Sequence, residues 1–162
     1  MPHSMVNQPA PRGLILKNQH GEDINLDDSI GKKLTVVFFY PQDRTYGCTK
    51  EVCYFRDSHT VFSEAGAVVF GVSSDSPEMH KKFAEEQNLP YQLLSDPDDK
   101  AKKAFKVQKS FLILPGRVTY LIDKDGKIQD VFESQSDLEG HAKKAVEFIK
   151  RHANENSVDA SL

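Results

Sequence analysis

Two short apolar runs without polar alternation dominate the hydrophobic pattern of the chain. They cover residues 34–40 and 67–72, and the first is rich in β-branched and aromatic residues. Runs of this kind are typical of strands whose two faces are both covered within a sheet. The pattern therefore predicts two central strands, and a loop over 41–47 that contains proline and glycine follows the first of them.

Between these two strands, apolar side chains recur with the spacing of a helix. The positions fall on one face, so the stripe that they form is expected to face the core. The stripe consists of Cys48, Val52, Phe55, His59 and Phe62. Gly66 follows the stripe and is a typical helix end, so a single helix is predicted before the second central strand.

The remaining elements are predicted from capping residues, turn residues and helical spacing. They are a helix from Ser76-Pro77 to about Gln87, a short strand over 91–94, a short helix that includes 101–105, a hairpin over 118–122 and 127–131, and a C-terminal helix over 138–149. This order describes an α/β protein of thioredoxin-like fold, with a central mixed β-sheet flanked by helices. Composition alone fits a flavodoxin-like arrangement equally well.

Composition and charge narrow the classes of function. The chain has 162 residues, of which 38% are hydrophobic, and this is enough for one core without disulfide staples. The 21 basic and 24 acidic side chains give a net charge of -3 and form no basic run, so nucleic-acid binding is not expected. The longest apolar stretch, 36–40, is far shorter than the roughly 20 residues of a membrane-spanning helix. We therefore expect a soluble protein without a membrane partner.

We expect a single domain over 13–152. Residues 1–12 are predicted to form a disordered N-terminus, in which 1–4 could be foreign to the natural protein and Met5 the native start, and 153–162 a flexible polar tail. The N-terminus has no apolar signal region and too few Arg and Ser residues for an intact transit peptide. The expected location is intracellular and cytoplasmic by default, with a plastid (as a mature form) or the nucleus left open.

Two cysteines carry the candidate chemistry, and they are too few for a disulfide framework or a four-thiolate zinc site. Cys48 lies where a strand passes into a helix, so unpaired backbone N–H groups and the positive end of the helix dipole favour its thiolate. On an intact helix, Cys48 and Cys53 would have Cα atoms about 8.7 Å apart, whereas a disulfide usually needs less than about 7 Å. A disulfide between them therefore requires the first helical turn to unravel.

The residues around the first cysteine form a specific motif. Pro41, Thr45 and Cys48 have the spacing P-x-x-x-T-x-x-C, which resembles the active-site signature of the peroxiredoxin superfamily. With Cys53 five residues further on, the stretch resembles the peroxiredoxin Q or bacterioferritin-comigratory branch, an atypical 2-Cys group. Further similar segments are 55–57, 93–96, 114–120 and 122–123, so the resemblance covers roughly residues 16–149.

This resemblance implies a thiol-dependent peroxidase that reduces hydrogen peroxide and organic hydroperoxides. Cys48 would be the peroxidatic cysteine and become a sulfenic acid, and Cys53 would be the resolving cysteine that forms an intramolecular disulfide with it. Thioredoxin, or alternatively glutaredoxin, would reduce this disulfide. The resemblance implies no cofactor and no metal, and a monomer is expected because the disulfide needs no second subunit.

Other residues are expected to support Cys48. Breaking an O–O bond heterolytically requires hydrogen-bond donors at both oxygens, and Thr45 can supply a hydroxyl. Arg117 matches by position the arginine that points at the peroxidatic thiolate in the family, although by its local sequence it reads as a surface arginine at a strand start. Glu51 either accepts a hydrogen bond from such an arginine or is a solvated helix residue.

The loop before Cys48 contains both matches to the motif and departures from it. Pro41 either forms a rigid wall that shields the thiolate or simply starts the loop. Gly47 either allows a sharp backbone turn or fits a tight space. Tyr46 stands where proline is usual in the branch, and Arg44 adds a positive charge. These two departures remove no reacting group, but they leave the conformation of the loop open.

Three other interpretations compete with the peroxidase. A thioredoxin-like dithiol-disulfide oxidoreductase would have two residues between its cysteines, whereas here four residues intervene. A metal-binding or non-catalytic redox-sensing module would have to recruit His59 with both cysteines, and the remaining histidines lack ligand spacing. Finally, Cys48 and Cys53 could be simple buried hydrophobic residues, but the spacing of Pro41, Thr45 and Cys48 argues against this.

Overall fold

The computed structural model describes residues 3–107 and 116–160. Its strands form one mixed seven-stranded sheet with the order β2-β1-β5-β4-β3-β6-β7. The strands are β1 (Ile15–Asn18), β2 (Asp23–Asn25), β3 (Thr35–Phe39), β4 (Val68–Ser73), β5 (Gln92–Ser95), β6 (Val118–Ile122) and β7 (Ile128–Glu133). The pairs β3–β4 and β4–β5 are parallel, and the pairs on both flanks are antiparallel.

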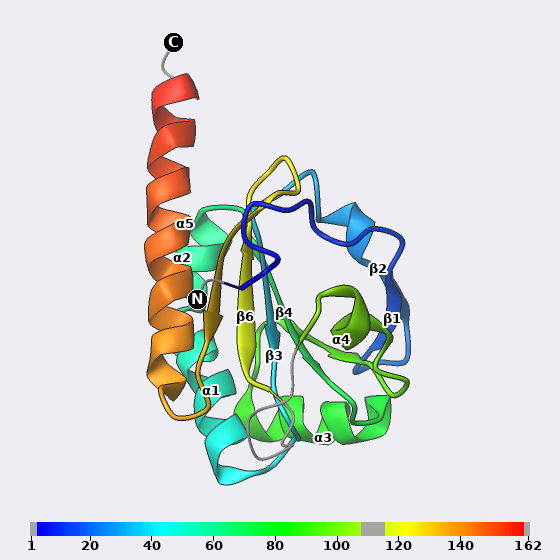
Figure 1. Ribbon diagram of the computed structural model, residues 1–162. Coiled ribbons are helices and arrows are strands. Elements are labelled where there is room, and N and C mark those ends of the chain that lie inside the picture. The colour runs from blue at the N-terminus through cyan, green and yellow to red at the C-terminus, as the bar shows by residue number, and fades with distance from the viewer. Residues whose placement is uncertain (1–2, 108–115, 161–162) are drawn as a thin grey trace.

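Helices cover the sheet from two sides (Figure 1). They are α1 (Tyr46–Asp57), α2 (His59–Glu64), α3 (Pro77–Gln87), α4 (Lys100–Ala104) and α5 (Leu138–Ala160), together with the 3-10 turn η1 (Leu26–Asp28). In Figure 1, α1, α2 and α5 lie on one side of the sheet and α4 lies on the other. None of the described helices is both long and apolar enough to cross a membrane.

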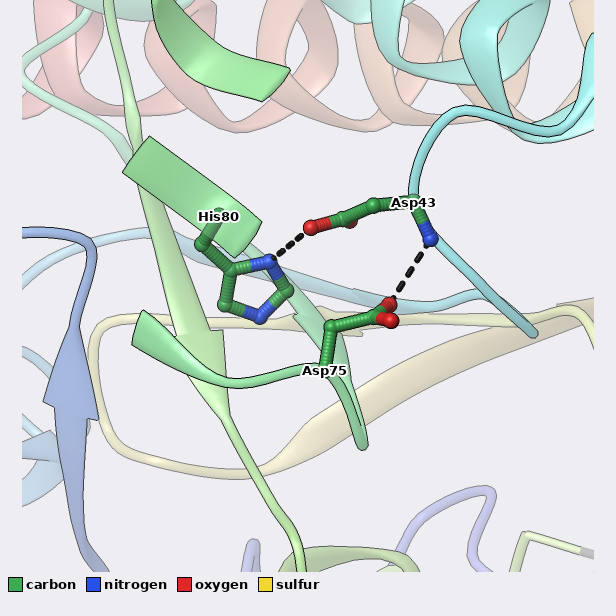
Figure 2. A group of neighbouring side chains, drawn as sticks. All are labelled: Asp43, Asp75 and His80. Atoms are coloured by element: carbon green, nitrogen blue, oxygen red, sulfur yellow. Dashed lines mark hydrogen bonds and ion pairs between the residues drawn. The ribbon is translucent and has the colours of Figure 1, made fainter. Parts of the chain in front are cut away.

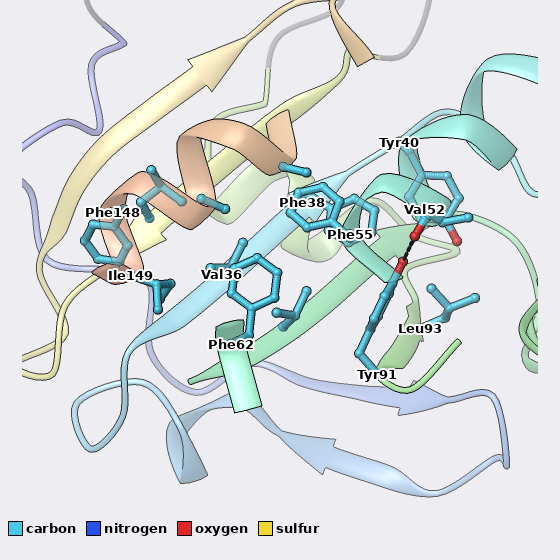
Figure 3. Close-up of a cluster of buried hydrophobic side chains, with 14 of the residues drawn as sticks. Val36, Phe38, Tyr40, Val52, Phe55, Phe62, Tyr91, Leu93, Phe148 and Ile149 are labelled. Carbon is cyan, nitrogen blue, oxygen red and sulfur yellow. Dashed lines mark hydrogen bonds between the residues drawn. The ribbon is translucent and has the colours of Figure 1, made fainter. Parts of the chain in front are cut away.

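Strand β3 explains the first apolar run, because all five of its residues are buried. Val36 and Phe38 point into the core under α1 and α5, whereas Val37 and Phe39 point into the opposite core under α4. In the first core, Phe38 stacks on Phe55 of α1 with ring centroids 4.2 Å apart (Figure 3). Full burial of such a ring contributes roughly 1.5–3 kcal/mol. This packing holds the C-terminal part of α1 against the sheet.

The predicted central strands, the hairpin at the sheet edge and the helix that begins after Ser76 are confirmed. The single helix predicted between the central strands is wrong in two ways. It begins earlier, at Tyr46, and it breaks at Ser58 into α1 and α2. No proline or glycine marks this break, so side-chain spacing alone could not reveal it. Gly66, with a φ of +68°, follows α2 as expected.

The hairpin of β1 and β2 was not predicted, because its strands are too short to give a pattern. In β1, exposed and buried residues alternate over only four positions, and Ile15 is 49% exposed. β2 has three residues and none of them is fully buried. Gly21, with a φ of +76°, lies in the turn between the two strands.

The described residues near both chain ends form hydrogen bonds or regular secondary structure. Met5 and Ala10 are buried, and the backbone N–H groups of Asn7 and Ala10 donate to the carbonyls of Ile128 and Gly126. These contacts hold the described part of 1–12 against the hairpin of β6 and β7. At the other end, α5 continues to Ala160, because the polar residues beyond 152 include no proline or glycine that would stop a helix. Residues 1–2 and 161–162 lie outside the described residues.

Candidate active site

Thr45 determines where α1 begins. Its backbone is extended, and its Oγ1 accepts a hydrogen bond from the backbone N–H of Cys48 at 3.4 Å. The hydroxyl donates in turn to the Gln42 carbonyl at 3.2 Å. Thr45 is therefore the N-cap of α1, and Cys48 is the third helical residue. The first backbone N–H groups of a helix have no partner within it, so the positive end of α1 surrounds the cysteine.

The two cysteines have different surroundings, and neither is in a disulfide. Cys48 is fully buried and packs in the core beside Val52. Cys53 is half-buried, and its Sγ donates to Oε1 of Gln87 in α3 at 3.2 Å. Burial raises the pKa of the Cys53 thiol, and the charge of Arg56 offsets this only in part. Cys53 is therefore a protonated thiol that lies away from the positive end of the helix.

Arg117, directly before β6, joins Cys48 to Glu51. Its Nη1 donates to Oε1 of Glu51 at 2.7 Å, and the Glu51 side chain is completely buried. Burial lowers the pKa of Arg117, but the negative charges of Cys48 and then Glu51 raise it more, so the net shift is upward. The guanidinium therefore stays charged between a sulfur and a carboxylate. Of the two readings of Glu51, the structure shows the one in which it bonds an arginine.

Oε2 of Glu51 is buried without a hydrogen-bond partner among the described residues. Nδ1 of His141 lies 3.9 Å from this oxygen. The Nε2 of the same ring donates to the Ser134 carbonyl and therefore carries the hydrogen of the neutral imidazole. Nδ1 then has no hydrogen to donate to Glu51 and accepts one from the Thr119 hydroxyl. Burial lowers the pKa of His141, which keeps the ring neutral. As a result, among the described residues Arg117 is the cation that compensates the charge of Glu51. Burial raises the pKa of Glu51 to about 7, and the hydrogen bond from Arg117 only limits this rise.

This shift predicts a pH-dependent stability that Glu51→Gln removes. The pKa of Glu51 rises from 4.5 to about 7 on folding, so the folded protein binds more protons than the unfolded chain between these pH values. Stability from this group therefore falls as pH rises through that window, by on the order of 3 kcal/mol. Urea unfolding of both proteins under reducing conditions should show their free energies of unfolding diverging by this amount, with the exposed Glu64→Gln as control. Parallel pH profiles would contradict the prediction.

Gly47 is explained by the approach of Arg117. A Cβ atom at this position would lie 2.9 Å from Nη2 of Arg117, so a side chain there would displace the guanidinium. The backbone of Gly47 is not in the left-handed region, so the sharp-turn reading is not supported. Pro41 is half-buried and is separated from the end of β3 by Tyr40. Leu114 and Pro115, part of the motif before Arg117, lie outside the described residues.

The two departures from the motif are accommodated in the loop. Tyr46 is the first residue of α1, where proline is favoured but not required. Tyr46 is 78% exposed, and Nζ of Lys50 lies 4.9 Å from its ring centroid. Arg44 has a φ of +66°, and its Nη2 donates to Oε2 of Glu86 at 3.1 Å. The loop therefore reaches the helix start without the usual proline.

Sequence reasoning missed a buried polar group beside this loop. Asp43 and His80 are buried and joined by a hydrogen bond, and Asp75 accepts from the Asp43 backbone (Figure 2). Only the position of Asp43 within the motif loop could have drawn attention to it. Among the described residues, these three form the one group with a geometry that could hold a metal ion. Neither cysteine belongs to it, nor does His59, so the interpretation as a cysteine–histidine metal site has no support.

The family model for the AhpC/TSA family matches residues 6–131 of the chain. The chain belongs to the AhpC/TSA family. Within it, peroxiredoxin Bcp of Bacillus subtilis is 48% identical over 129 residues, which cover 76% of this chain and 81% of that protein. The chloroplastic peroxiredoxin Q of Gentiana triflora is 43% identical over 142 residues, or 87% of this chain. The chain spans 65% of the length of that relative.

A solved structure of this AhpC/TSA branch supports the fold assignment. Peroxidoxin BcpB from Mycobacterium tuberculosis superposes with a TM-score of 0.83 at 34% identity, covering 92% of this chain and 98% of that one. The predicted thioredoxin-like fold is therefore confirmed, and the flavodoxin-like alternative is excluded. The resemblance to the peroxiredoxin Q and bacterioferritin-comigratory branch is confirmed as well.

Proposed function

We propose that this AhpC/TSA protein is a thiol-dependent peroxidase that reduces hydrogen peroxide and organic hydroperoxides. The observation that carries the proposal is the convergence of Arg117 and the positive end of α1 on the buried Cys48. Both features stabilise negative charge, which the attacking thiolate carries and the departing oxygen acquires. A dithiol exchange site needs no such set of donors around a single sulfur.

In the first step, the Cys48 thiolate attacks one oxygen of the peroxide and the O–O bond breaks. The sulfur becomes a sulfenic acid, and the departing oxygen leaves with the bonding electron pair and takes up a proton as water or an alcohol. Arg117 and the first-turn N–H groups would hold the two oxygens in line. The Thr45 hydroxyl, which donates to the Gln42 carbonyl in this state, would turn toward the peroxide. Pro41 would help to exclude water.

In the second step, Cys53 attacks the sulfur of the sulfenic acid. The S–O bond breaks, a disulfide forms, and the released hydroxide leaves as water with the proton that Cys53 gives up. Both cysteines belong to the unbroken helix α1, whose geometry separates their Cα atoms by about 8.7 Å. The first turn must therefore open before the disulfide can close.

A dithiol protein such as thioredoxin would return both cysteines to the thiol state, and glutaredoxin is the alternative reductant. One chain contains both reacting cysteines, so the cycle is compatible with a monomer. The names of the relatives, chloroplastic in plants and Bcp in a bacterium, are compatible with action in a plastid or in the cytoplasm.

Counting thiols tests this function directly. One equivalent of hydrogen peroxide added to the reduced protein should remove two free thiols. The mass of the protein should fall by that of two hydrogens, because a disulfide forms and no oxygen is retained. With thioredoxin, thioredoxin reductase and NADPH, continuous NADPH oxidation should follow addition of peroxide. Thiols that survive equimolar peroxide would overturn the proposal. Reduction of a protein disulfide without any reaction with peroxide would favour the dithiol oxidoreductase instead.

A further inference from the structure

A buried pair formed by Asp43 and His80 lies beside the loop that leads to Cys48 (Figure 2). Nδ1 of His80 is 2.6 Å from Oδ2 of Asp43, and Nε2 is 3.0 Å from the Leu94 carbonyl. A carbonyl oxygen can only accept, so Nε2 carries a hydrogen and donates to Leu94. The other ring nitrogen, Nδ1, forms its short contact with Oδ2 of Asp43 in a fully buried site, and the Tyr40 hydroxyl lies 3.5 Å from the same nitrogen.

Tyr40 completes the contacts of the Asp43 side chain. Its hydroxyl donates to Oδ1 of Asp43 at 2.6 Å. Burial and the adjacent Asp43 charge raise the pKa of Tyr40 well above its ordinary value, so the phenol keeps its proton and donates. Both oxygens of the Asp43 carboxylate are thus bound, one by the end of β3 and the other by α3.

The backbone of Asp43 is held as well. Its N–H donates to Oδ2 of Asp75 at 2.7 Å, and the same oxygen accepts from Oγ of Ser73 at 2.7 Å. Asp43 is therefore fixed through its side chain by Tyr40, which follows β3, and by His80 of α3, and through its main chain by Asp75, which follows β4. Each of the three candidate metal ligands is already used in these hydrogen bonds, so the group is complete without a cation.

Asp43 lies two positions before Thr45, the N-cap of α1. Between them, Arg44 adopts the left-handed conformation that is unfavourable for a residue with a side chain. Such a conformation persists only where its neighbours are held in place, and Asp43 and Thr45 are its neighbours. The first turn of α1, which contains Cys48, therefore depends on the position of Asp43.

Helix α3 contacts the other half of the site through its last turn. Glu86 accepts from Arg44, and Gln87 accepts from the Cys53 thiol. One helix thus holds the loop before Cys48 through His80 and holds Cys53 through Gln87. Helix α3 therefore stabilises, from outside α1, the helical conformation that separates the two cysteines.

We propose that His80 is a positioning residue for Cys48, which acts through Asp43 to keep the first turn of α1 closed and so limits the rate of disulfide formation. This inference rests on the proposed peroxidase function, because it concerns the step between the sulfenic acid and the disulfide. A weaker link should raise the fraction of molecules with an open turn. Disulfide formation should then be faster, while the closed geometry required for attack on peroxide should be less populated.

Two substitutions of His80 separate its two hydrogen bonds. The amide of His80→Gln can reach the position of Nε2 and keep the bond to Leu94 while it loses Asp43, whereas the amide of His80→Asn can replace Nδ1 and keep Asp43. We expect His80→Gln to form the disulfide about tenfold faster or more after oxidation, with slower oxidation of Cys48. A tenfold change corresponds to about 1.4 kcal/mol. His80→Asn should stay close to the wild type in both steps.

Stopped-flow kinetics with excess peroxide resolves the two steps, and hydrogen exchange of the amides of 44–49 reports the opening independently of any reaction. Exchange should be faster in His80→Gln than in His80→Asn. Equal exchange and equal disulfide rates in the two variants would overturn the inference, as would slower disulfide formation in His80→Gln. If wild-type Cys48 does not react with peroxide, the proposed function fails, and the exchange data still decide the role of His80.

If His80→Gln does not fold, Asp75→Ala provides the same test from the backbone side. Asp75 is only half-buried, and its removal deprives the Asp43 N–H of its acceptor without touching the His80 ring. This variant should also open the first turn of α1 and accelerate disulfide formation. Amide exchange of 44–49 at the wild-type rate in Asp75→Ala would count against the inference.

Discussion

Cys48→Ser is expected to abolish reduction of peroxide, whereas Cys53→Ser should still reduce one equivalent of peroxide per chain. A serine hydroxyl remains protonated where a thiol ionises, and its oxygen is a poor nucleophile toward peroxide, so the first variant should lose activity by on the order of 10³-fold or more. In the second variant, Cys48 can still become a sulfenic acid, but nothing resolves it. That acid should persist and then oxidise further to the sulfinic state.

Each of these variants is the control for the other, because each keeps one cysteine of the pair. The measurements are the amount of peroxide consumed per chain in the first seconds and the mass of the protein afterwards. Cys53→Ser should gain one oxygen at equimolar peroxide and a second at higher concentration, while Cys48→Ser should gain none. A Cys53→Ser protein that consumes no peroxide, or a Cys48→Ser protein that does, would reverse the assigned roles.

The sequence predicted those parts of the fold that leave a long pattern. Strand β3 and the strand after Gly66 were recognisable because both of their faces are buried. Helix α3 was recognisable from Ser76 and Pro77 at its start. The hairpin of β1 and β2 was missed because its strands are short, and the contacts of 3–12 were missed because they are made mainly by the backbone. Backbone hydrogen bonds leave no mark on the pattern of side chains.

Within the candidate site, local spacing placed Thr45 and Cys48 at the helix start, and the family resemblance was needed to reach Arg117. The reason for a glycine at position 47 became clear only from the approach of that guanidinium, which belongs to a residue distant in the sequence. Asp43 and His80 are 37 residues apart, and each appears ordinary in its own segment. A network of this kind exists only after β3, β4 and α3 have come together, so no local pattern could predict it.

Replacement of Arg117 by Gln should slow the oxidation of Cys48 by roughly 10²- to 10³-fold, the usual cost of losing one donor that stabilises charge in a transition state. Arg117→Lys should recover only part of this loss. A guanidinium can donate to Glu51 with one nitrogen and serve Cys48 with another, whereas an ammonium is a single point charge. The loss of Arg117 also leaves Glu51 without its hydrogen-bonded partner, which should keep that carboxyl protonated to higher pH.

The pH dependence of these rates distinguishes two contributions of Arg117. If the guanidinium only promotes ionisation of Cys48, the Arg117→Gln protein should approach the wild-type oxidation rate at alkaline pH, where thiols ionise without assistance. If it also polarises the peroxide, the slower oxidation of Arg117→Gln should persist at alkaline pH, and this is the result that we expect.

Arg56→Gln is the matched control, because Arg56 bonds Asp57 and the Gln87 carbonyl on the Cys53 side of α1. Its oxidation rate should stay within about threefold of the wild type, since surface ion pairs of this kind have small effects. A comparable loss in both arginine variants would mean that total positive charge, and not the position of Arg117, governs the reaction.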